Sequence, residues 1–412
     1  MKHDRLDFIG LTLGNQSTWY NGSRLSGFLF DNERSIIILY VTTAIVVSFQ
    51  TFLAGPWKET SLIYNQYNNY IIFKQSWLHL IHHQDLYAKY AEEYYDLFKY
   101  SPTFAMFFGL FSFLPDRLGL IFWNLLNAVC LSAAVLQLPQ MTRKSKVSIL
   151  IFVMVEMTIA LQNSQSNALI AGLIILAFTL LEKDRYFFAA LCIVASAFIK
   201  IFGLLAFVLF LFYPRKGRLL VYSALVTISL ALLPLLFISF SQLKFLYTSW
   251  YHLLMEDYSN ESGLSMMGWL ATWFNWTIDT YKVVLAGLFV FLIPLVHRKL
   301  YTEDRFRLFM LSSLLIWVII FNHMAESPSY VIAMSGVGIW FYSGERTTIN
   351  WILVTLAFIF TSLSQTDIFS ARIQDRFIDP YVVKAVPCIL VWLKITFDAL
   401  WNREDKIAMQ AP

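Results

Sequence analysis

The sequence predicts an all-α polytopic membrane protein, a bundle of about 12–13 transmembrane helices that each need about 20 apolar residues. Its composition is 58% hydrophobic and only 14% charged, with a mean hydropathy of +0.58. Soluble domains are about half apolar. Apolar runs recur along the whole chain and are separated by short charged connectors, which leaves no room for a sizeable soluble domain. We therefore treat residues 1–412 as a single integral membrane domain.

The first apolar run, residues 35–53, follows a charged N-terminal segment that lacks the apolar core of a signal peptide, so we expect an uncleaved anchor. Residues 55–100 then form an unusually long polar loop, rich in acids, histidines and tyrosines. Long ordered connections are uncommon in membrane bundles, because each ordered residue costs conformational entropy and the polar backbone must be hydrogen-bonded within the protein or hydrated. We expect short amphipathic helices in this first external loop and regard the loop as a candidate site.

The remaining spans lie within residues 103–400. The run 103–114 is short for a crossing, and we interpret it as a half-span packed beside the site. A cation, Lys200, interrupts one apolar stretch and predicts a tight reversal there. Residues 241–280 form a second large external loop. The other predicted spans are 118–138, 147–161, 168–181, 186–199, 201–213, 219–240, 283–296, 308–321, 330–341, 349–363 and 386–400.

Clusters of Lys and Arg in short connectors predict the cytoplasmic side of the bundle. Counting spans from these clusters places residues 162–167, 200, 241–280, 322–329 and 364–384 together on the opposite face. The formal charge of +4 is too small and dispersed for nucleic acid binding. The clusters are Arg143, Lys144 and Lys146, then Arg215, Lys216 and Arg218, then Arg298, Lys299, Arg305 and Arg307, and finally Arg403 and Lys406 near the C-terminus.

We expect no cofactor and no metal. The three cysteines, Cys130, Cys192 and Cys388, lie in or beside apolar runs without the spacing of a zinc site, which is typical of packing residues. His82 and His83 are adjacent, so on a helix they point about 100° apart and cannot share one metal.

Carboxylates and cations of the predicted external face are the candidates for chemistry. A transferase at a membrane surface needs a base for the acceptor hydroxyl and a cation for a leaving phosphate. Asp85 and Asp96 in the first loop are candidate bases, although the same acids also fit the solvated face of an amphipathic helix. Lys200 is a candidate anion ligand, because a cation in apolar surroundings usually faces a partner or cavity, or else snorkels to the interface.

Other polar residues of that face have two interpretations each. Gln165 and Asn167 are placed to hydrogen-bond a sugar or phosphate, or to cap helices. His323 and Glu326 are three apart, so a helical turn would put them on one face, while Ser327 before Pro328 predicts a helix N-cap. The cations of the last external segment fit an anionic lipid head or general headgroup contact, namely Arg372, Arg376 and Lys384.

The order of several short motifs resembles the GT-C superfamily of membrane glycosyltransferases, and within it the bacterial polyprenyl-phosphate-mannose-dependent alpha-(1,2)-mannosyltransferase-like family. The resemblance covers residues 64–218 well and the remainder by hydropathy. The matching motifs are Asn69-Tyr70-Ile71-Ile72-Phe73, Leu86-Tyr87, Tyr100-Ser101-Pro102, Leu114-Pro115, Trp123-Asn124, Ser164-Gln165-Ser166-Asn167 and Ile199-Lys200-Ile201.

This resemblance implies a GT-C-like bundle that moves a hexose, such as mannose, from a polyprenyl-phosphate donor to a lipid-linked or envelope glycan. It implies inverting, base-assisted attack in a cavity facing away from the cytoplasm, in a bacterial inner membrane and among its lipids. Lys200 would anchor the phosphate, and Tyr87 and Tyr100 would line the substrate site.

One departure from the family pattern concerns the base. Asn69 stands where the family has its catalytic aspartate, and a neutral amide cannot accept the hydroxyl proton as a carboxylate does. The base then comes from Asp85, Asp96 or Glu326, or the alignment of Asn69 is shifted. The alternative function is a non-catalytic protein that binds or transports polyprenyl-linked glycans.

Overall fold

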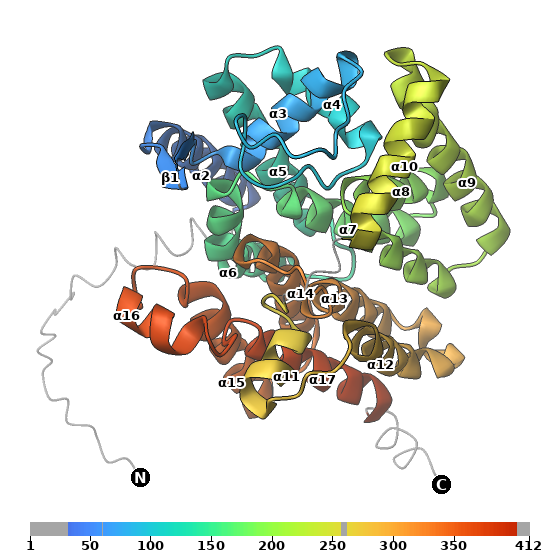
Figure 1. The fold of residues 1–412 in the computed structure, drawn as a ribbon. Coiled ribbons are helices and arrows are strands. Elements are labelled where there is room, and N and C mark those ends of the chain that lie inside the picture. Colours follow the sequence, from blue (N-terminus) through green and yellow to red (C-terminus); the bar gives the residue numbers. More distant parts are fainter. Residues whose placement is uncertain (1–31, 60, 257–261, 402–412) are drawn as a thin grey trace, which may run out of the picture.

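The computed structural model describes residues 32–59, 61–256 and 262–401. The predicted all-α fold is confirmed: helices dominate these residues, and the strands among them form one short hairpin (Figure 1). The predictions for residues 1–31 lie outside the described residues, as do residues 257–261 of the second external loop.

The first half of the chain builds the N-terminal part of the bundle and its long loop. Polar caps set where several helices begin: Ser101 accepts from the Phe104 N–H at 3.1 Å ahead of Pro102, and Thr142 accepts from the Ser145 N–H at 3.2 Å. The elements are α2 Glu33–Leu53, β1 Trp57–Glu59, β2 Leu62–Tyr64, α3 Asn68–Ile81, α4 Pro102–Ser112, α5 Asp116–Leu136, α6 Arg143–Gln162, α7 Asn167–Glu182 and α8 Tyr186–Ile199.

The second half contains more irregular helices. Two α-helices end in a short 3-10 turn that carries a proline, Pro234 or Pro294. The elements are the 3-10 helix η1 Ile201–Phe212, α9 Lys216–Leu232, η2 Leu233–Leu236, α10 Phe240–Glu256, α11 Met266–Phe274, α12 Thr280–Leu292, η3 Ile293–Val296, η4 Arg298–Thr302, α13 Asp304–Ile320, η5 Ser327–Ser329, α14 Tyr330–Ser343, α15 Thr348–Leu356, the π-helix η6 Ala357–Leu363, α16 Ala371–Ile373, the π-helix η7 Gln374–Ile378 and α17 Val386–Trp401.

The surface of the bundle is that of a membrane protein. Four helices are long and apolar enough to span a bilayer by length and composition, namely Glu33–Leu53, Asp116–Leu136, Arg143–Gln162 and Lys216–Leu236. Shorter apolar helices of 10–17 residues accompany them. The outer faces of α9 and α12 expose large apolar side chains, such as Leu220 and Phe289, which are 65% and 69% exposed. Continuous apolar faces of this kind suit lipid rather than water.

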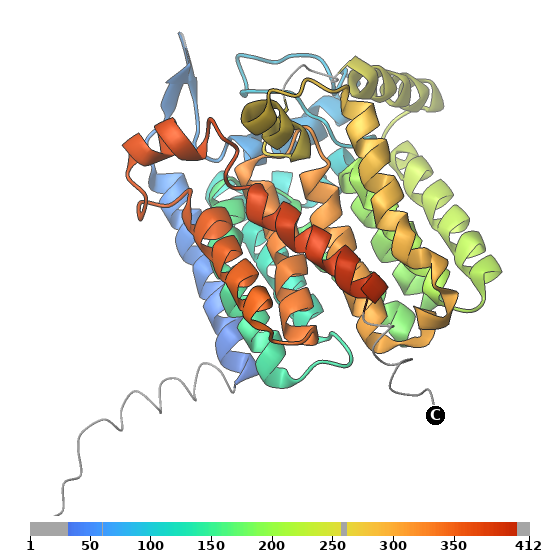
Figure 2. The same ribbon diagram turned by 90° about the horizontal axis from the view of Figure 1, so that it is seen from below.

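Hydrogen bonds and ion pairs identify two distinct ends of the bundle. At the end with the cationic connectors, Arg143 pairs with Glu33 at 3.6 Å and Arg307 pairs with Glu182 at 2.7 Å. These pairs join the starts of α6 and α13 to the start of α2 and the end of α7. We call the opposite end, where residues 163–167, 200 and 322–329 lie, the polar end. Figure 2 shows the β hairpin, α10 and α11 together at the polar end.

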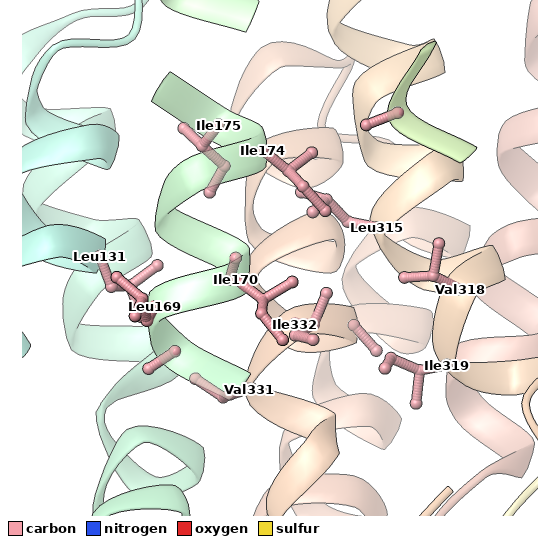
Figure 3. Packing of buried hydrophobic residues seen from close by; sticks show 14 of the residues in the cluster. Leu131, Leu169, Ile170, Ile174, Ile175, Leu315, Val318, Ile319, Val331 and Ile332 are labelled. Atoms are coloured by element: carbon pink, nitrogen blue, oxygen red, sulfur yellow. The ribbon is translucent and has the colours of Figure 1, made fainter. Parts of the chain in front are cut away.

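Helix α7 is the centre of the apolar core. Its side chains are buried on nearly every side, which is the pattern expected of a fully enclosed helix. Figure 3 shows Ile170 and Ile174 of α7 facing Leu315 of α13 and Ile332 of α14, with Leu131 of α5 beyond Leu169. Packing on all sides therefore fixes the position of Asn167, the first residue of α7.

Helix α4 is 11 residues long, which is short for a full crossing, and the half-span stays a prediction. Ser101, just before it, donates to the Phe198 carbonyl at the end of α8 at 2.6 Å, and Asp116, just after it, pairs with Lys74 of α3 at 2.5 Å.

The second external loop, predicted for residues 241–280, contains helices. Helix α10 docks on the first loop, where Ser249 Oγ donates to Asp85 and Trp250 Nε1 donates to the Lys99 carbonyl at 3.3 Å. Apolar side chains on one face of α10, such as Leu243 and Leu246, are buried. Helical periodicity within this polar stretch was the signal that would have revealed α10.

Lys384 corrects an expectation. We expected it to reach lipid headgroups, but its Nζ lies 2.6 Å from Glu156 Oε1, with side-chain exposures of 1% and 0%. Its Nζ also lies 5.4 Å from the centre of the Tyr330 ring. A lone acid within a span, Glu156 of α6, requires a partner, and Lys384 supplies it because the chain before α17 enters the bundle.

We expect Lys384→Met to lower the free energy of unfolding by about 3–5 kcal/mol, because it leaves the Glu156 carboxylate buried without its cation. Thermal unfolding in detergent measures this loss. Lys282→Met is the matched control: Lys282 and Asp279 are also 2.6 Å apart, but both side chains are more than half exposed. The control should leave the unfolding midpoint unchanged. Equal losses of stability in the two variants would contradict the view that burial makes the Lys384–Glu156 pair important.

Candidate functional site

Three turns at the polar end of the bundle are joined by one chain of hydrogen bonds. Lys200 Nζ donates to Asn167 Oδ1 at 3.0 Å, the Asn167 amide donates to Gln165 Oε1, and Gln165 Nε2 donates to Glu326 Oε2 at 2.6 Å. These residues come from the turns α8–η1, α6–α7 and α13–α14. We call this set of four residues the polar relay.

The turn at Lys200 is the tight reversal that the sequence predicts. Lys200 has an extended backbone, with φ −135° and ψ 129°, between the end of α8 and the start of η1. Its carbonyl accepts from the Gly203 N–H at 2.9 Å. A Cβ on Gly203 would lie 2.6 Å from the Ala197 nitrogen, so the backbones approach too closely for any larger residue.

The turn between α6 and α7 is held from two sides. Ser164 has a positive φ of 53°, and its carbonyl accepts from Trp123 Nε1 at 2.8 Å. The preceding carbonyl, of Asn163, accepts from Asn69 Nδ2 at 2.9 Å. With both carbonyls bound, the turn presents Gln165 and Asn167 in a fixed arrangement.

The turn that carries Glu326 differs from the expected helical one. Residues 322–326 form a non-helical turn, so His323 and Glu326 do not share a helix face. Glu326, rather than Ser327, is the N-cap residue of η5, and it is an exposed residue. Residues from the second external loop brace this turn, since the Leu264 N–H donates to the Ala325 carbonyl at 2.9 Å.

Burial and charge set the electrostatics at Lys200. Burial lowers the pKa of the Lys200 ammonium, the carboxylate of Glu326 opposes this shift, and Lys99 adds to it. The hydrogen-bond acceptor of the ammonium, Asn167 Oδ1, is neutral, so the ammonium has only part of the compensation that a direct ion pair would provide. This arrangement is suited to an additional anion.

Tyr100 lies against the polar relay. Lys200 Nζ is 5.9 Å from the centre of the Tyr100 ring. Burial raises the pKa of the Tyr100 hydroxyl, and the carboxylates of Glu326 and Asp96 raise it further. Tyr87 supports this position, because its hydroxyl donates to the Tyr100 carbonyl at 3.0 Å. The structure thus places Tyr100 beside the relay, and Tyr87 contacts the backbone of Tyr100.

The two first-loop acids have other partners. Ser249 Oγ is 2.9 Å from both oxygens of Asp85, and Asp85 Oδ1 also accepts from the Tyr87 N–H at 3.1 Å. Asp85 therefore ties α10 to the loop. Asp96 lies 3.6 Å from Lys99 Nζ and has a half-exposed side chain.

Arg372 and Arg376 lie apart from the polar relay. Both are exposed on α16 and η7, and Figures 1 and 2 show α16 on the opposite side of the molecule from α10. Their neighbours include exposed apolar side chains, such as Phe377 at 61%. The structure does not bring these two arginines to the site.

Sequence reasoning missed Lys99 and Ser249. Lys99 directly precedes the Tyr100-Ser101-Pro102 motif and acts on Lys200 electrostatically. Its position next to that motif was a usable signal. No sequence signal marked Ser249, because its pairing with Asp85 depends on how α10 docks.

The arrangement offers a cation and an accessible carboxylate, connected through two amides. A cation of this kind can stabilise a phosphate that gains charge, and an accessible carboxylate can take a proton. Of the residues predicted from the sequence, the structure brings together Tyr87, Tyr100, Gln165, Asn167, Lys200 and Glu326.

Comparison with known families gives a match over much of the chain. The profile of the family described as Glycosyltransferase family 87 matches residues 98–321, more than half of the 412-residue chain. The matched range includes Tyr100, Gln165, Asn167 and Lys200, while Asn69, Asp85 and Asp96 precede it and Glu326 follows it. A search of curated proteins finds no match.

We expect Lys200→Met to preserve or raise the thermal unfolding midpoint of the ligand-free protein in detergent. The substitution removes a cation whose pKa is lowered by burial and keeps the apolar length of the side chain. Lys384→Met is the comparison, because it breaks a buried ion pair. A loss for Lys200→Met as large as that for Lys384→Met would show that Lys200 has a structural role instead.

Proposed function

This chain belongs to glycosyltransferase family 87 and is a membrane glycosyltransferase, and from this premise we propose that it moves a hexose from a polyprenyl-phosphate donor to a lipid-linked or envelope glycan acceptor. Mannose is the sugar we favour, following the family resemblance of the motifs in residues 64–218. The proposed reaction inverts the anomeric configuration and is assisted by a base.

The observation that carries this proposal is the position of Lys200. In the transfer, an acceptor hydroxyl attacks the anomeric carbon, the bond from that carbon to the phosphate oxygen breaks, and the phosphate leaves with the bonding electron pair. The negative charge that develops on the phosphate requires a cation in a region of low dielectric constant. Lys200 satisfies this requirement, because its ammonium is held by Asn167 at 3.0 Å and lacks a direct carboxylate partner among the described residues.

We place the reaction on the non-cytoplasmic side of the membrane, in a bacterial inner membrane. Support comes from the position of the polar relay at the end opposite to the cationic connectors of α6 and α13. Short cationic connectors favour the cytoplasmic side. A lipid-linked donor also suits a site among lipid-facing helices.

The alternative, a protein that binds or transports polyprenyl-linked glycans without catalysis, rested on Asn69 at the position of the family's base. Glu326 weakens that argument, because it places a carboxylate in the same relay as Lys200. Transfer by purified protein separates the two functions, since a transporter would bind the donor and leave it intact.

We expect Lys200→Met to lower the transfer rate from a labelled polyprenyl-phosphate hexose to the endogenous acceptors of native membranes by about 100-fold or more, the cost of removing one key electrostatic group. The assay measures label in acceptor products. Lys244→Met, an exposed lysine on α10, is the control and should retain activity. Full activity of folded Lys200→Met would contradict the phosphate role.

A further inference from the structure

We infer that Glu326, and not a carboxylate of the first loop, accepts the proton of the acceptor hydroxyl. This assignment rests on the proposed glycosyl transfer and identifies its general base. It places the base in the turn between α13 and α14, more than 200 residues from Asn69 in the sequence.

Asn69 has a structural task in place of a catalytic one. Its Nδ2 donates to the Asn163 carbonyl at 2.9 Å and so ties the start of α3 to the end of α6, next to the turn that carries Gln165. A donor amide is what that contact requires, because an ionised carboxylate has no proton to donate to a carbonyl. The neutral residue at this position is therefore explained by its contact.

The two first-loop acids are poorly placed as bases. Ser249 Oγ lies 2.9 Å from both oxygens of Asp85 and shares its one proton between them, and Oδ1 also accepts from the Tyr87 N–H, so this carboxylate is engaged in holding α10 on the loop. Asp96 is paired with Lys99, and its own backbone has a positive φ of 77°. Neither carboxylate takes part in the hydrogen bonds of the polar relay.

Glu326 meets the requirements of a general base better than Asp85 or Asp96. It is exposed, so an acceptor can reach it, and one of its oxygens accepts from Gln165 Nε2 at 2.6 Å, which orients the carboxylate. Among the described residues, Gln165 is the hydrogen-bond donor to its side chain, which leaves Oε1 for an acceptor hydroxyl. The relay through Gln165 and Asn167 also fixes its position relative to Lys200.

The chemistry balances with these groups alone. The acceptor oxygen forms a bond to the anomeric carbon while the carbon to phosphate-oxygen bond breaks. Its proton passes to Glu326, and the electron pair of the broken bond stays on the phosphate near Lys200. Protonated Glu326 returns the proton to solvent when the products leave, because its side chain is exposed.

The test compares isosteric variants in the native-membrane transfer assay, with labelled polyprenyl-phosphate mannose and glucose as donors and donor binding measured separately on the purified protein. We expect Glu326→Gln to lower the transfer rate by about 10²- to 10⁴-fold, the usual contribution of a general base, with donor binding and unfolding midpoint retained. Asp96→Asn makes the same chemical change in the first loop and should retain most activity.

Glu326→Asp supplies a second variant, since it keeps the carboxylate and the charge. It should retain partial activity, because a carboxylate one methylene shorter can still accept the proton, while Glu326→Gln has no group there that can accept it. The assignment would be overturned if Glu326→Gln kept substantial transfer activity. It would also be overturned if Asp96→Asn lost transfer activity while Glu326→Gln kept it. A wild-type protein that binds donor and transfers to no acceptor would overturn the proposed function itself, and the assignment with it.

Discussion

The hydrogen bond from Lys200 to Asn167 is the interaction on which the site depends, because it joins two turns whose helices otherwise meet through apolar packing. Apolar contacts are non-directional and define the position of a helix better than the direction of a polar group. A charged donor and an amide acceptor add that direction. Through Gln165 the same chain of bonds reaches Glu326, so three turns become one constellation.

The rigidity of this constellation comes from α7. This helix is enclosed by α5, α8, α13 and α14, and its first residue is Asn167. A helix packed on all sides cannot shift without opening cavities in a close-packed interior. The bundle therefore provides a fixed platform, and the lipid-facing helices α9 and α12 surround it with apolar surface.

Lys384 and Lys200 differ in how their charge is compensated. Lys384 is paired directly with Glu156, which satisfies the charge and makes the pair a structural link between α6 and the segment before α17. Lys200 has an amide in place of a direct carboxylate, and its pKa is lowered by burial. A cation left with incomplete compensation is a cost to stability that a bound anion can offset.

Sequence reasoning singled out Lys200 because a lone charge in an apolar run is informative by itself. The same argument applied to Glu156, a single acid within a predicted span, would have predicted a buried partner. Composition could not separate the acids of the first loop, because many acids lie there and no local pattern shows that Asp85 contacts Ser249, 164 residues away.

By itself, the sequence determined the all-α membrane fold, the approximate positions of the apolar helices, the reversal at Lys200 and the grouping of polar turns at one end, because hydropathy and charge placement act locally along the chain. Only the tertiary structure decided which polar residues meet. The Gln165 to Glu326 contact spans 161 residues, and Lys384 to Glu156 spans 228. Such pairings follow from how buried helices pack against one another, which no local pattern encodes.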